Sequence, residues 1–222
     1  MKSTYAEAFN HDDQAARYDE AVRNESDPIR AGYADVLDWV VEQACIAPES
    51  VVLDLGSGTG NLSRRVGACQ QLVCVDVSEK MTRIAQKKLS HLAGVRYVQA
   101  DLLEYVDNAP QLFDVVISTY AVHHLLEREK QHLFERLWRC LRPGGRAAFG
   151  DLMLERREVE ASTVQRFRAS EQHAVAEAIE EEWFWYVDTA VAGLNRLGFE
   201  TAQRRFSDLS WGIAATKPRS AT

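Results

Sequence analysis

The sequence predicts an α/β fold, a mostly parallel sheet with helices on both faces that ends in an antiparallel hairpin. Between residues 51 and 151, short apolar runs alternate with helical segments, as in successive strand–helix units. Two further strand-like runs, 202–206 and 211–216, complete the hairpin. At 222 residues the chain can bury one sizeable core, so we expect a single domain over 1–222.

Composition narrows the class of protein. The formal net charge of -7 disfavours broad nucleic-acid binding, which needs basic surface to displace counterions. The four cysteines lack C-x-x-C spacing and indicate reduced thiols, which suits a cytoplasmic protein. The first residues lack the apolar core of a signal peptide, and no run approaches the roughly 20 apolar residues of a membrane span. We therefore expect no membrane partner.

Residues 1–45 form the predicted N-terminal cap and helix. Residues 1–28, which include Tyr18, are polar and have no long period. This leaves two alternatives open, a helix or arm packed on the domain edge and a mobile cover over the ligand. From residue 29 to 45, apolar residues recur at intervals of three and four and predict an amphipathic helix that faces the core.

The chain is organised around residues 51–60. The apolar run 51–55 predicts a strand buried on both faces, and Gly56, Gly58 and Gly60 then remove every Cβ that would block close approach to the backbone. Residues 61–66 can start a helix whose positive end would face a nucleotide. The G-x-G-x-G spacing is one residue shorter than the G-x-G-x-x-G fingerprint of dinucleotide-binding proteins. It therefore argues against a nicotinamide oxidoreductase.

The second predicted strand, 72–75, is closed by Asp76, about twenty residues past the glycine turn. A doubly wound fold places at that distance an acid that binds both ribose hydroxyls. The alternative is a charge at the start of the next helix, for which Ser78 is the predicted N-cap. Met81, in the first turn of that helix, either reaches an adenine ring or belongs to the core.

The third predicted strand, 95–100, ends at Asp101, and the fourth, 113–118, ends at 119–125. Ligands of open α/β sheets lie outside the carboxyl ends of the strands, so we expect 119–125 to face the reacting groups. A helix over 127–141 and a fifth strand over 146–151 follow, separated by a Pro-Gly-Gly stop. Beyond them the sequence predicts helix over 158–182, an aromatic cluster at 183–186 and another helix over 187–197.

Three of these motifs resemble the class I S-adenosylmethionine-dependent methyltransferases: the acidic residue before G-x-G-x-G, the Leu-Arg-Pro-Gly-Gly stop, and an aromatic residue with a histidine pair after the fourth strand. The Tyr-Ala-x-His-His-Leu pattern is similar to the uncharacterised YrrT-like group. The resemblance implies a Rossmann-like, seven-stranded sheet and S-adenosyl-L-methionine as cofactor. The cofactor-binding residues it implies are Asp54, Gly56, Ser57, Gly58, Gly60, Asp76, Val77, Met81, Asp101, Leu102 and Thr119. Asp101 would accept from the adenine amino group, unless it only caps a helix.

Methyl transfer is a direct displacement that needs the acceptor in line with the methyl group in a dry pocket. A general base is useful only if the acceptor loses a proton, and His123, His124 and Tyr120 are the catalytic candidates. For each histidine the alternative is a capping or packing role. We expect no metal, because adjacent residues on a loop rarely both face one ion. Tyr18 and Trp183, the latter in a segment 152–186 that could cover the substrate, are predicted to close over the acceptor.

The predicted function is methyl transfer to a small-molecule acceptor. The chain lacks the N-P-P-Y tetrad of enzymes that methylate amino groups of adenine or glutamine, and the Pro-Cys pair of cytosine-C5 enzymes. An RNA-modifying methyltransferase, disfavoured by charge, and a non-catalytic protein that binds the cofactor stay open as alternatives. The sequence leaves the acceptor, the methylated atom and the oligomeric state undetermined.

Overall fold

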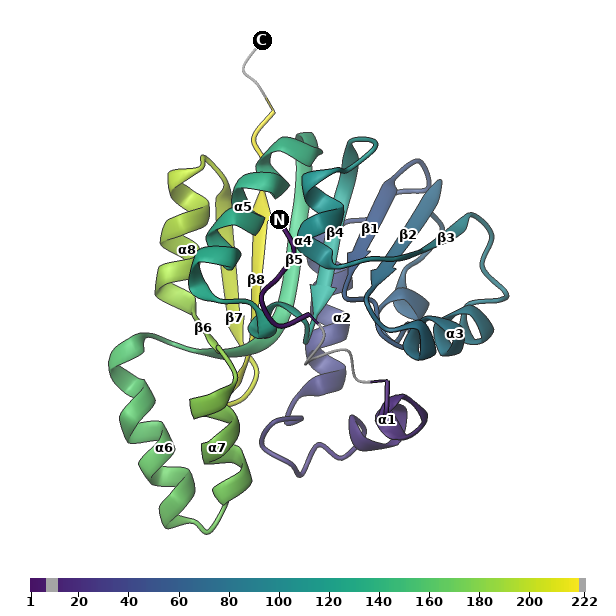
Figure 1. Ribbon diagram of the computed structural model, residues 1–222. Coiled ribbons are helices and arrows are strands. Elements are labelled where there is room, and N and C mark those ends of the chain that lie inside the picture. The colour runs from purple at the N-terminus through teal and green to yellow at the C-terminus, as the bar shows by residue number, and fades with distance from the viewer. Residues whose placement is uncertain (7–11, 220–222) are drawn as a thin grey trace.

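The computed structural model describes residues 1–6 and 12–219. Its strands are β1 (Val51–Leu55), β2 (Gln71–Asp76), β3 (Val95–Gln99), β4 (Phe113–Thr119), β5 (Leu141–Leu154), β6 (Trp185–Tyr186), β7 (Glu200–Arg205) and β8 (Ser210–Thr216). They form one sheet in the order β3-β2-β1-β4-β5-β8-β7, with β6 paired to β5 outside this path (Figure 1). Strand β8 runs antiparallel to both of its neighbours, β5 and β7, and the other strand pairs of the described residues are parallel, so the predicted mostly parallel sheet and terminal hairpin are confirmed.

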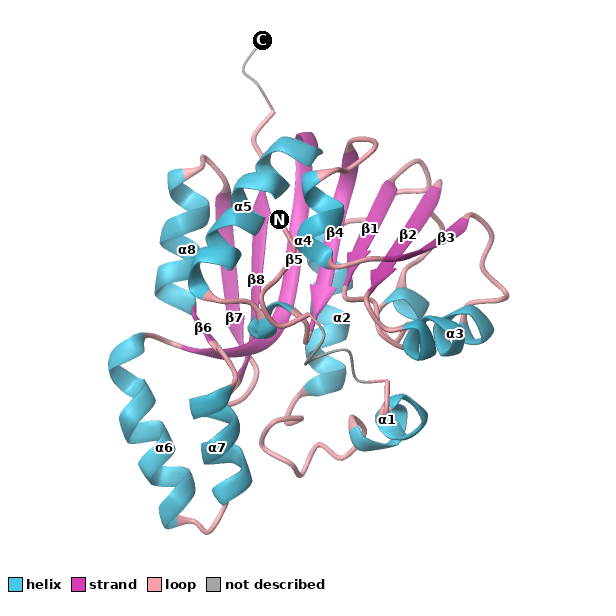
Figure 2. Cartoon of the chain, viewed as in Figure 1, coloured by secondary structure: helices cyan, strands magenta, loops and turns pink. Residues whose placement is uncertain are grey.

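Helices cover both faces of this sheet (Figure 2). They are α1 (Ala15–Ala21), α2 (Tyr33–Ala44), α3 (Glu79–Lys88), α4 (Leu102–Asp107), α5 (Glu127–Cys140), α6 (Glu160–Ala169), α7 (His173–Glu181) and α8 (Val187–Arg196). Helices α2, α3, α6 and α7 contribute to the apolar core on one face, and α4, α5 and α8 to the core on the other. Short 3-10 turns are η1 (Ser63–Arg65), η2 (Val122–His124) and η3 (Arg157–Val159).

Strand β1 lies at the centre of the sheet and has both faces covered, as its uninterrupted apolar run predicts. Val52 packs into the core under α2, while Leu53 and Leu55 pack into the core under α4 and α5. The strand order reverses between β1 and β4, because the chain leaves β1 toward β2 on one side and returns to β4 on the other. Such a switch point is where open α/β sheets bind ligands.

The predicted helix over 61–66 is wrong. The chain makes only the 3-10 turn η1, and at Val66 the backbone is already extended, with φ -64° and ψ 127°. Gly67 follows, and β2 begins at Gln71, so there is no room for further helical turns. The glycine turn therefore works without a helix dipole behind it, and its binding groups are its own backbone and the side chains around it.

Two other expectations need correction. The helix predicted over 158–182 is two helices, α6 and α7, joined by a turn in which Glu171 has φ 60°. The fifth strand begins at Leu141 rather than 146, since Leu141 pairs with Phe113 and Arg146 with Val115. The Pro-Gly-Gly segment between these pairs loops out of the ladder instead of ending the helix in a separate turn.

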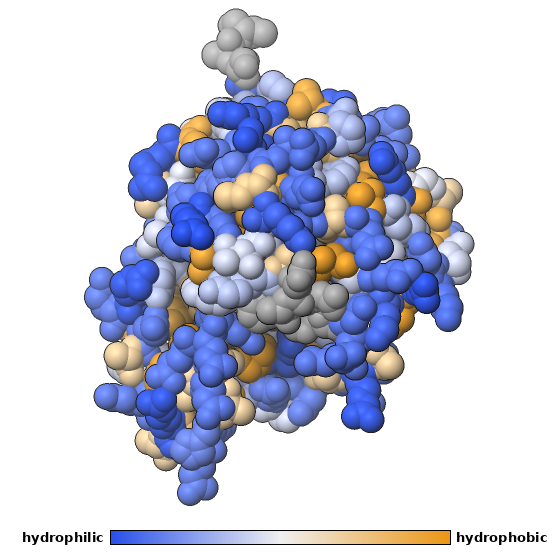
Figure 3. All heavy atoms as spheres, viewed as in Figure 1, coloured by the Kyte–Doolittle hydropathy of each residue, from blue (hydrophilic) through white to orange (hydrophobic). Residues whose placement is uncertain are grey.

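The surface of the described residues is largely polar. Figure 3 shows one face on which hydrophilic side chains dominate and hydrophobic ones are scattered. Over residues 1–6 and 12–219, the large hydrophobic side chains with high exposure are Met1, Tyr5 and Leu112. In the same ranges no helix has the length and apolar composition that crossing a membrane would require.

Candidate functional site

A cavity lies at the carboxyl ends of β1, β2 and β4, at the switch point of the sheet. Its wall includes most of the residues predicted from the sequence: Tyr18, Gly56, Ser57, Gly58, Asp76, Val77, Met81, Asp101, Leu102, Thr119, Tyr120, His123 and His124. Three predicted residues, Asp54, Gly60 and Trp183, lie outside this wall. The sheet topology thus brings the end of β4 and the glycine turn to one place.

Asp76 and Gly58 lie together in the wall of the cavity. The Asp76 carboxylate accepts hydrogen bonds from the backbone N–H of Gly58 at 2.7 Å and of Ser78 at 2.8 Å. Each bond uses one oxygen, and a carboxylate has about four acceptor sites, so acceptor sites remain for a pair of ribose hydroxyls. Gly58 has φ 51°, and a Cβ built there would meet no protein atom within 4 Å. These features fit a nucleoside with a free ribose diol.

Asp101 is the N-cap of α4. Its Oδ1 accepts from the backbone N–H of Leu103 and Glu104, and Ser3 donates both its backbone N–H and its hydroxyl to the same carboxylate. The structure therefore shows the capping role that was one alternative for this residue. Because Asp101 also lines the cavity, contact with an adenine amino group stays a prediction.

Asp54 and Gly60 support the glycine turn from behind. Asp54 is 1% exposed and accepts a hydrogen bond of 2.6 Å from the Ser63 hydroxyl, while its other oxygen has no hydrogen-bond partner among the described residues. Burial raises the pKa of Asp54 to about 7, and only the Ser63 bond opposes this shift. A Cβ at Gly60 would lie 3.3 Å from the Cβ of Ala85 in α3 and 3.2 Å from the side chain of Leu89, which caps the end of α3. Neither residue reaches the cavity.

The raised pKa of Asp54 predicts a pH-dependent stability. The unfolded state releases this proton near pH 4, whereas the folded state keeps it to about pH 7, so stability falls as the pH rises through that window. This difference between the pKa of the folded and the unfolded state corresponds to about 4 kcal/mol of unfolding free energy. We expect urea unfolding to show that the unfolding free energy of Asp54→Asn, relative to that of the wild type, increases from pH 4 to 7 by up to about that amount. Parallel pH curves for the two proteins would contradict the assignment.

A buried histidine–carboxylate pair lies beside the cavity, and His123 of this pair lines the wall. The Nδ1 atom of His123, a residue that is 4% exposed, lies 2.5 Å from Oδ1 of Asp151. Asp151 is 1% exposed and is the last residue of the strand predicted over 146–151. Asp151 also accepts from the backbone N–H of Val122, His123 and Leu152, and from the indole N–H of Trp185. With all these donors around it, Asp151 acts as the acceptor toward His123, which fixes the ring orientation.

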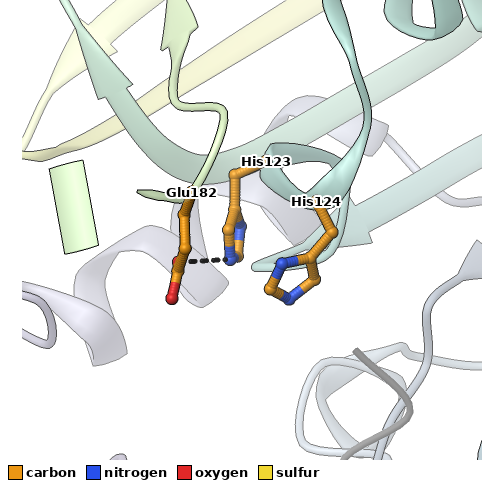
Figure 4. Close-up of side chains that lie close together, drawn as sticks. All are labelled: His123, His124 and Glu182. Carbon is orange, nitrogen blue, oxygen red and sulfur yellow. Dashed lines mark ion pairs between the residues drawn. The ribbon is translucent and has the colours of Figure 1, made fainter. Parts of the chain in front are cut away.

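Glu182 lies beside His123 in the wall of the cavity. It follows α7, and its Oε2 lies 3.4 Å from Nε2 of His123 (Figure 4). The turn η2 places the rings of His123 and His124 with centroids 3.9 Å apart, and one possible ligand atom from each of these histidines and from Glu182 lies within 4.8 Å of the others. We expected no metal because adjacent residues on a loop rarely both face one ion. Here the two adjacent histidines and Glu182 each have a ligand atom within 4.8 Å of the others, so that reason does not apply to this loop.

Tyr120 follows β4 in a left-handed conformation with φ 51°, which is rare for a bulky residue. Its backbone N–H donates to Gly150 O, and its hydroxyl lies 3.4 Å from the Ser210 hydroxyl. Burial raises the pKa of Tyr120, so the phenol stays protonated near neutral pH. The phenol proton is directed at the Ser210 hydroxyl, and the phenol is a poor general base.

Residues before β1 form one wall of the cavity. Tyr18 lines it, whereas Trp183 lies just outside and stacks on Tyr5, with ring centroids 4.4 Å apart. Asp19 ties α1 to the glycine turn by accepting from Thr59 and Asn61 and by pairing with Lys88. Of the predicted N-terminal segment, residues 7–11 lie outside the described residues. Ser3, Tyr5 and Tyr18 of the described part line the cavity, and a role as a cover over the ligand stays a prediction.

Sequence reasoning missed three residues of this site: Arg30, Asp151 and Glu182. Asp151 carried a usable signal, because it is an acid near the carboxyl end of a strand next to β4. Glu182 carried none, since it sits in a run of glutamates far along the chain and only tertiary packing brings it to His123. Arg30 precedes α2 in a loop with no recognisable pattern.

Comparisons with known proteins agree with this geometry. A sequence model of a methyltransferase domain matches residues 52–145. The chain is 30% identical over 213 residues to an uncharacterised methyltransferase of Oceanobacillus iheyensis, a match that covers 93% of this chain and 95% of the relative. It is 29% identical over 211 residues to an uncharacterised methyltransferase of Geobacillus kaustophilus, covering 95% of this chain and 93% of the relative.

Solved structures share the fold. The N-methyltransferase NodS from Bradyrhizobium japonicum, in complex with S-adenosyl-L-homocysteine, superposes with a TM-score of 0.67 at 14% identity, over 95% of this chain and 100% of that one. A DhpI–SAH complex superposes with a TM-score of 0.66 at 16% identity, over 93% of this chain and 94% of that one. From the near full-length match to the Oceanobacillus relative, together with this fold, the chain belongs to the class I S-adenosylmethionine-dependent methyltransferases.

Proposed function

We propose that this protein transfers the methyl group of S-adenosylmethionine to a small-molecule acceptor that has an anionic group. One observation carries the proposal. The wall of one cavity contains Gly58 and Asp76, the proposed nucleoside end, and also Arg30 and His123, the proposed acceptor end, so the nucleoside and the acceptor would share one enclosure. When bound, the cofactor supplies an electrophilic methyl group, and the residues at the far end determine what can approach it.

Arg30 supports an anionic acceptor. Its guanidinium carbon lies 5.8 Å from the ring centroid of Tyr18 and 5.6 Å from that of Tyr120, so it faces the cavity over two aromatic rings. Among residues 1–6 and 12–219, no carboxylate makes an ion pair with it. A guanidinium with free donors binds carboxylate or phosphate groups in a two-pronged geometry. An acceptor with such a group would be held in place by Arg30.

The N-terminal cover supports a small acceptor over a nucleic-acid strand. Ser3 binds Asp101, Thr4 donates to Glu129, and the terminal amino group pairs with Asp107. These bonds hold the first residues against the ends of α4 and α5, where Ser3 and Tyr5 line the cavity. A long polymer would have to displace the cover, whereas a metabolite would not.

His123 and Tyr120 have distinct roles in the proposed reaction. Asp151 orients the His123 ring, so Nε2 faces the acceptor end and can hold or remove an acceptor proton. A Tyr120 phenol that gives up its long 3.4 Å bond to the Ser210 hydroxyl can donate to an acceptor oxygen. Leu125 and Leu152 form apolar parts of the same wall and help to exclude water. In such a pocket, the orientation of the acceptor toward the methyl group would supply much of the rate.

A binding measurement and a transfer screen test this function. We expect calorimetry to show binding of S-adenosylmethionine and S-adenosylhomocysteine and no binding of NAD. With methyl-labelled cofactor and a cell extract, label should enter the anionic small-molecule fraction. Arg30→Gln should raise the KM for the acceptor by about tenfold or more, because one hydrogen bond to a charged group is lost. The control is Arg17→Gln, which changes an exposed arginine and should leave the KM unchanged. Label that enters only RNA or protein would overturn the proposed acceptor class.

A further inference from the structure

Three side chains with metal-binding atoms converge at the acceptor end of the cavity. His123 and His124 come from η2 and Glu182 from the segment after α7, and one ligand atom of each lies within 4.8 Å of the others. We call them the His–His–Glu cluster. Figure 4 shows the His123 ring between the Glu182 carboxylate and the His124 ring. All three line the cavity, so the cluster is open to a ligand on that side.

The contacts of His123 fix the state of its second nitrogen. Asp151 accepts from three backbone N–H groups and one indole N–H, which leaves His123 Nδ1 as a donor to the same carboxylate. In the neutral ring, Nε2 then has a lone pair that points toward the anionic Glu182. A histidine whose other nitrogen donates to a carboxylate is the usual arrangement around metal ligands, because the carboxylate orients the ring and makes the free nitrogen more basic.

The spacing between His123 and Glu182 fits two ligands of one ion. Nε2 and Oε2 are 3.4 Å apart. A direct charge-assisted hydrogen bond between such groups is shorter, about 2.7–2.9 Å. Two ligands bound tetrahedrally at about 2.0–2.1 Å from a metal ion are about 3.3–3.4 Å apart. We infer that the His–His–Glu cluster binds one divalent transition-metal ion.

The surrounding fold holds the two segments of the cluster together. Lys130 of α5 is 2% exposed, and its ammonium donates to the carbonyl of Leu125 beyond η2 and to the carbonyl of Trp183 beside Glu182. Trp185 donates to Asp151 from the same segment. Both sides of the cluster are thus anchored to buried groups, which limits the movement needed to close the ligands around an ion.

Two imidazoles and one carboxylate leave further coordination positions open toward the cavity. This ligand set suits zinc, cobalt, manganese or iron in the divalent state. An ion there would bind an acceptor oxygen and lower the affinity of that oxygen for its proton, a role that rests on the proposed methyl transfer. The binding of the ion itself does not depend on that function.

Direct metal titration tests the site. Full-length protein, free of any histidine tag and stripped with a chelator, is titrated calorimetrically with zinc and followed optically with cobalt. We expect one ion per chain and cobalt absorption bands typical of nitrogen and oxygen ligands. Asp151→Asn, which alters an outer contact, should weaken binding by about 10–100-fold, and Glu182→Gln, which removes a ligand oxygen charge, by at least as much.

Glu181→Gln is the matched control, because Glu181 is the exposed neighbour at the end of α7 and lies outside the cluster. Circular dichroism and binding of S-adenosylhomocysteine show that each variant is folded. No stoichiometric binding to the wild type, or equal affinities for Glu182→Gln and Glu181→Gln, would overturn the inference. Either result leaves cofactor binding and methyl transfer intact, so failure of the metal site is distinguishable from failure of the proposed function.

Discussion

Replacing Asp151 by asparagine is expected to lower turnover by about 10²–10⁴-fold, the range typical of losing a positioned acid–base group. Oδ2 of Asp151 accepts from the backbone N–H groups of Val122 and His123 and from the indole N–H of Trp185. The amide oxygen of the new asparagine must therefore face these donors. Its NH₂ group then faces His123 Nδ1, which becomes the acceptor. The ring proton moves to Nε2, and the lone pair that would take a proton or hold a metal ion is lost.

Asp151 acts through His123, so the measurement separates turnover from binding. We expect kcat to fall while the affinity for S-adenosylhomocysteine stays within about threefold, since the nucleoside end of the cavity does not contact Asp151. Asp38→Asn serves as the control, because its ion pair with Arg65 is on the surface and contributes little. Full turnover in a folded Asp151→Asn protein would show that the Nε2 lone pair has no part in the reaction.

The fold could be predicted from the sequence because its signals are local. The apolar run of β1, the glycine turn and the N-cap Ser78, which accepts from Met81 N–H, each depend on neighbours in the chain. The wrong predictions concern lengths that tertiary structure determines. The chain after Gly60 makes one 3-10 turn because β2 begins soon afterwards, and residues 158–182 break into α6 and α7 at a turn that no glycine or proline marks.

The site divides in the same way. The proposed nucleoside end is built within about twenty-five residues around β1 and β2, and Gly58, Asp76 and Met81 all line the cavity. The acceptor end joins Arg30, His123, Asp151 and Glu182, which belong to four distant segments. Their meeting depends on the length of β5, on the α6–α7 pair and on how the segment before α2 folds back. None of these has a short motif. Of the four residues, the sequence therefore predicted only His123, and the contacts that join it to the other three could only be found in the structure.

Replacing Asp76 by alanine is expected to weaken S-adenosylmethionine binding by at least about tenfold, because hydrogen bonds to a charged group contribute about 1.5–3 kcal/mol each. Two effects combine. The ribose hydroxyls lose their acceptor, and the backbone N–H groups of Gly58 and Ser78 lose the carboxylate that holds the turn in shape. Since a half-buried charge is also removed, the unfolding free energy should change much less than the affinity.

Calorimetry with S-adenosylmethionine and with adenine alone separates the two effects. If Asp76 binds the ribose, Asp76→Ala should lose affinity for the complete cofactor by a larger factor than for adenine, which has no hydroxyls for it to hold. Glu79→Ala is the control, because Glu79 lies three residues on, is exposed and pairs only with Arg83 on the surface of α3. A folded Asp76→Ala protein that binds the cofactor as tightly as the control would place the ribose elsewhere in the cavity.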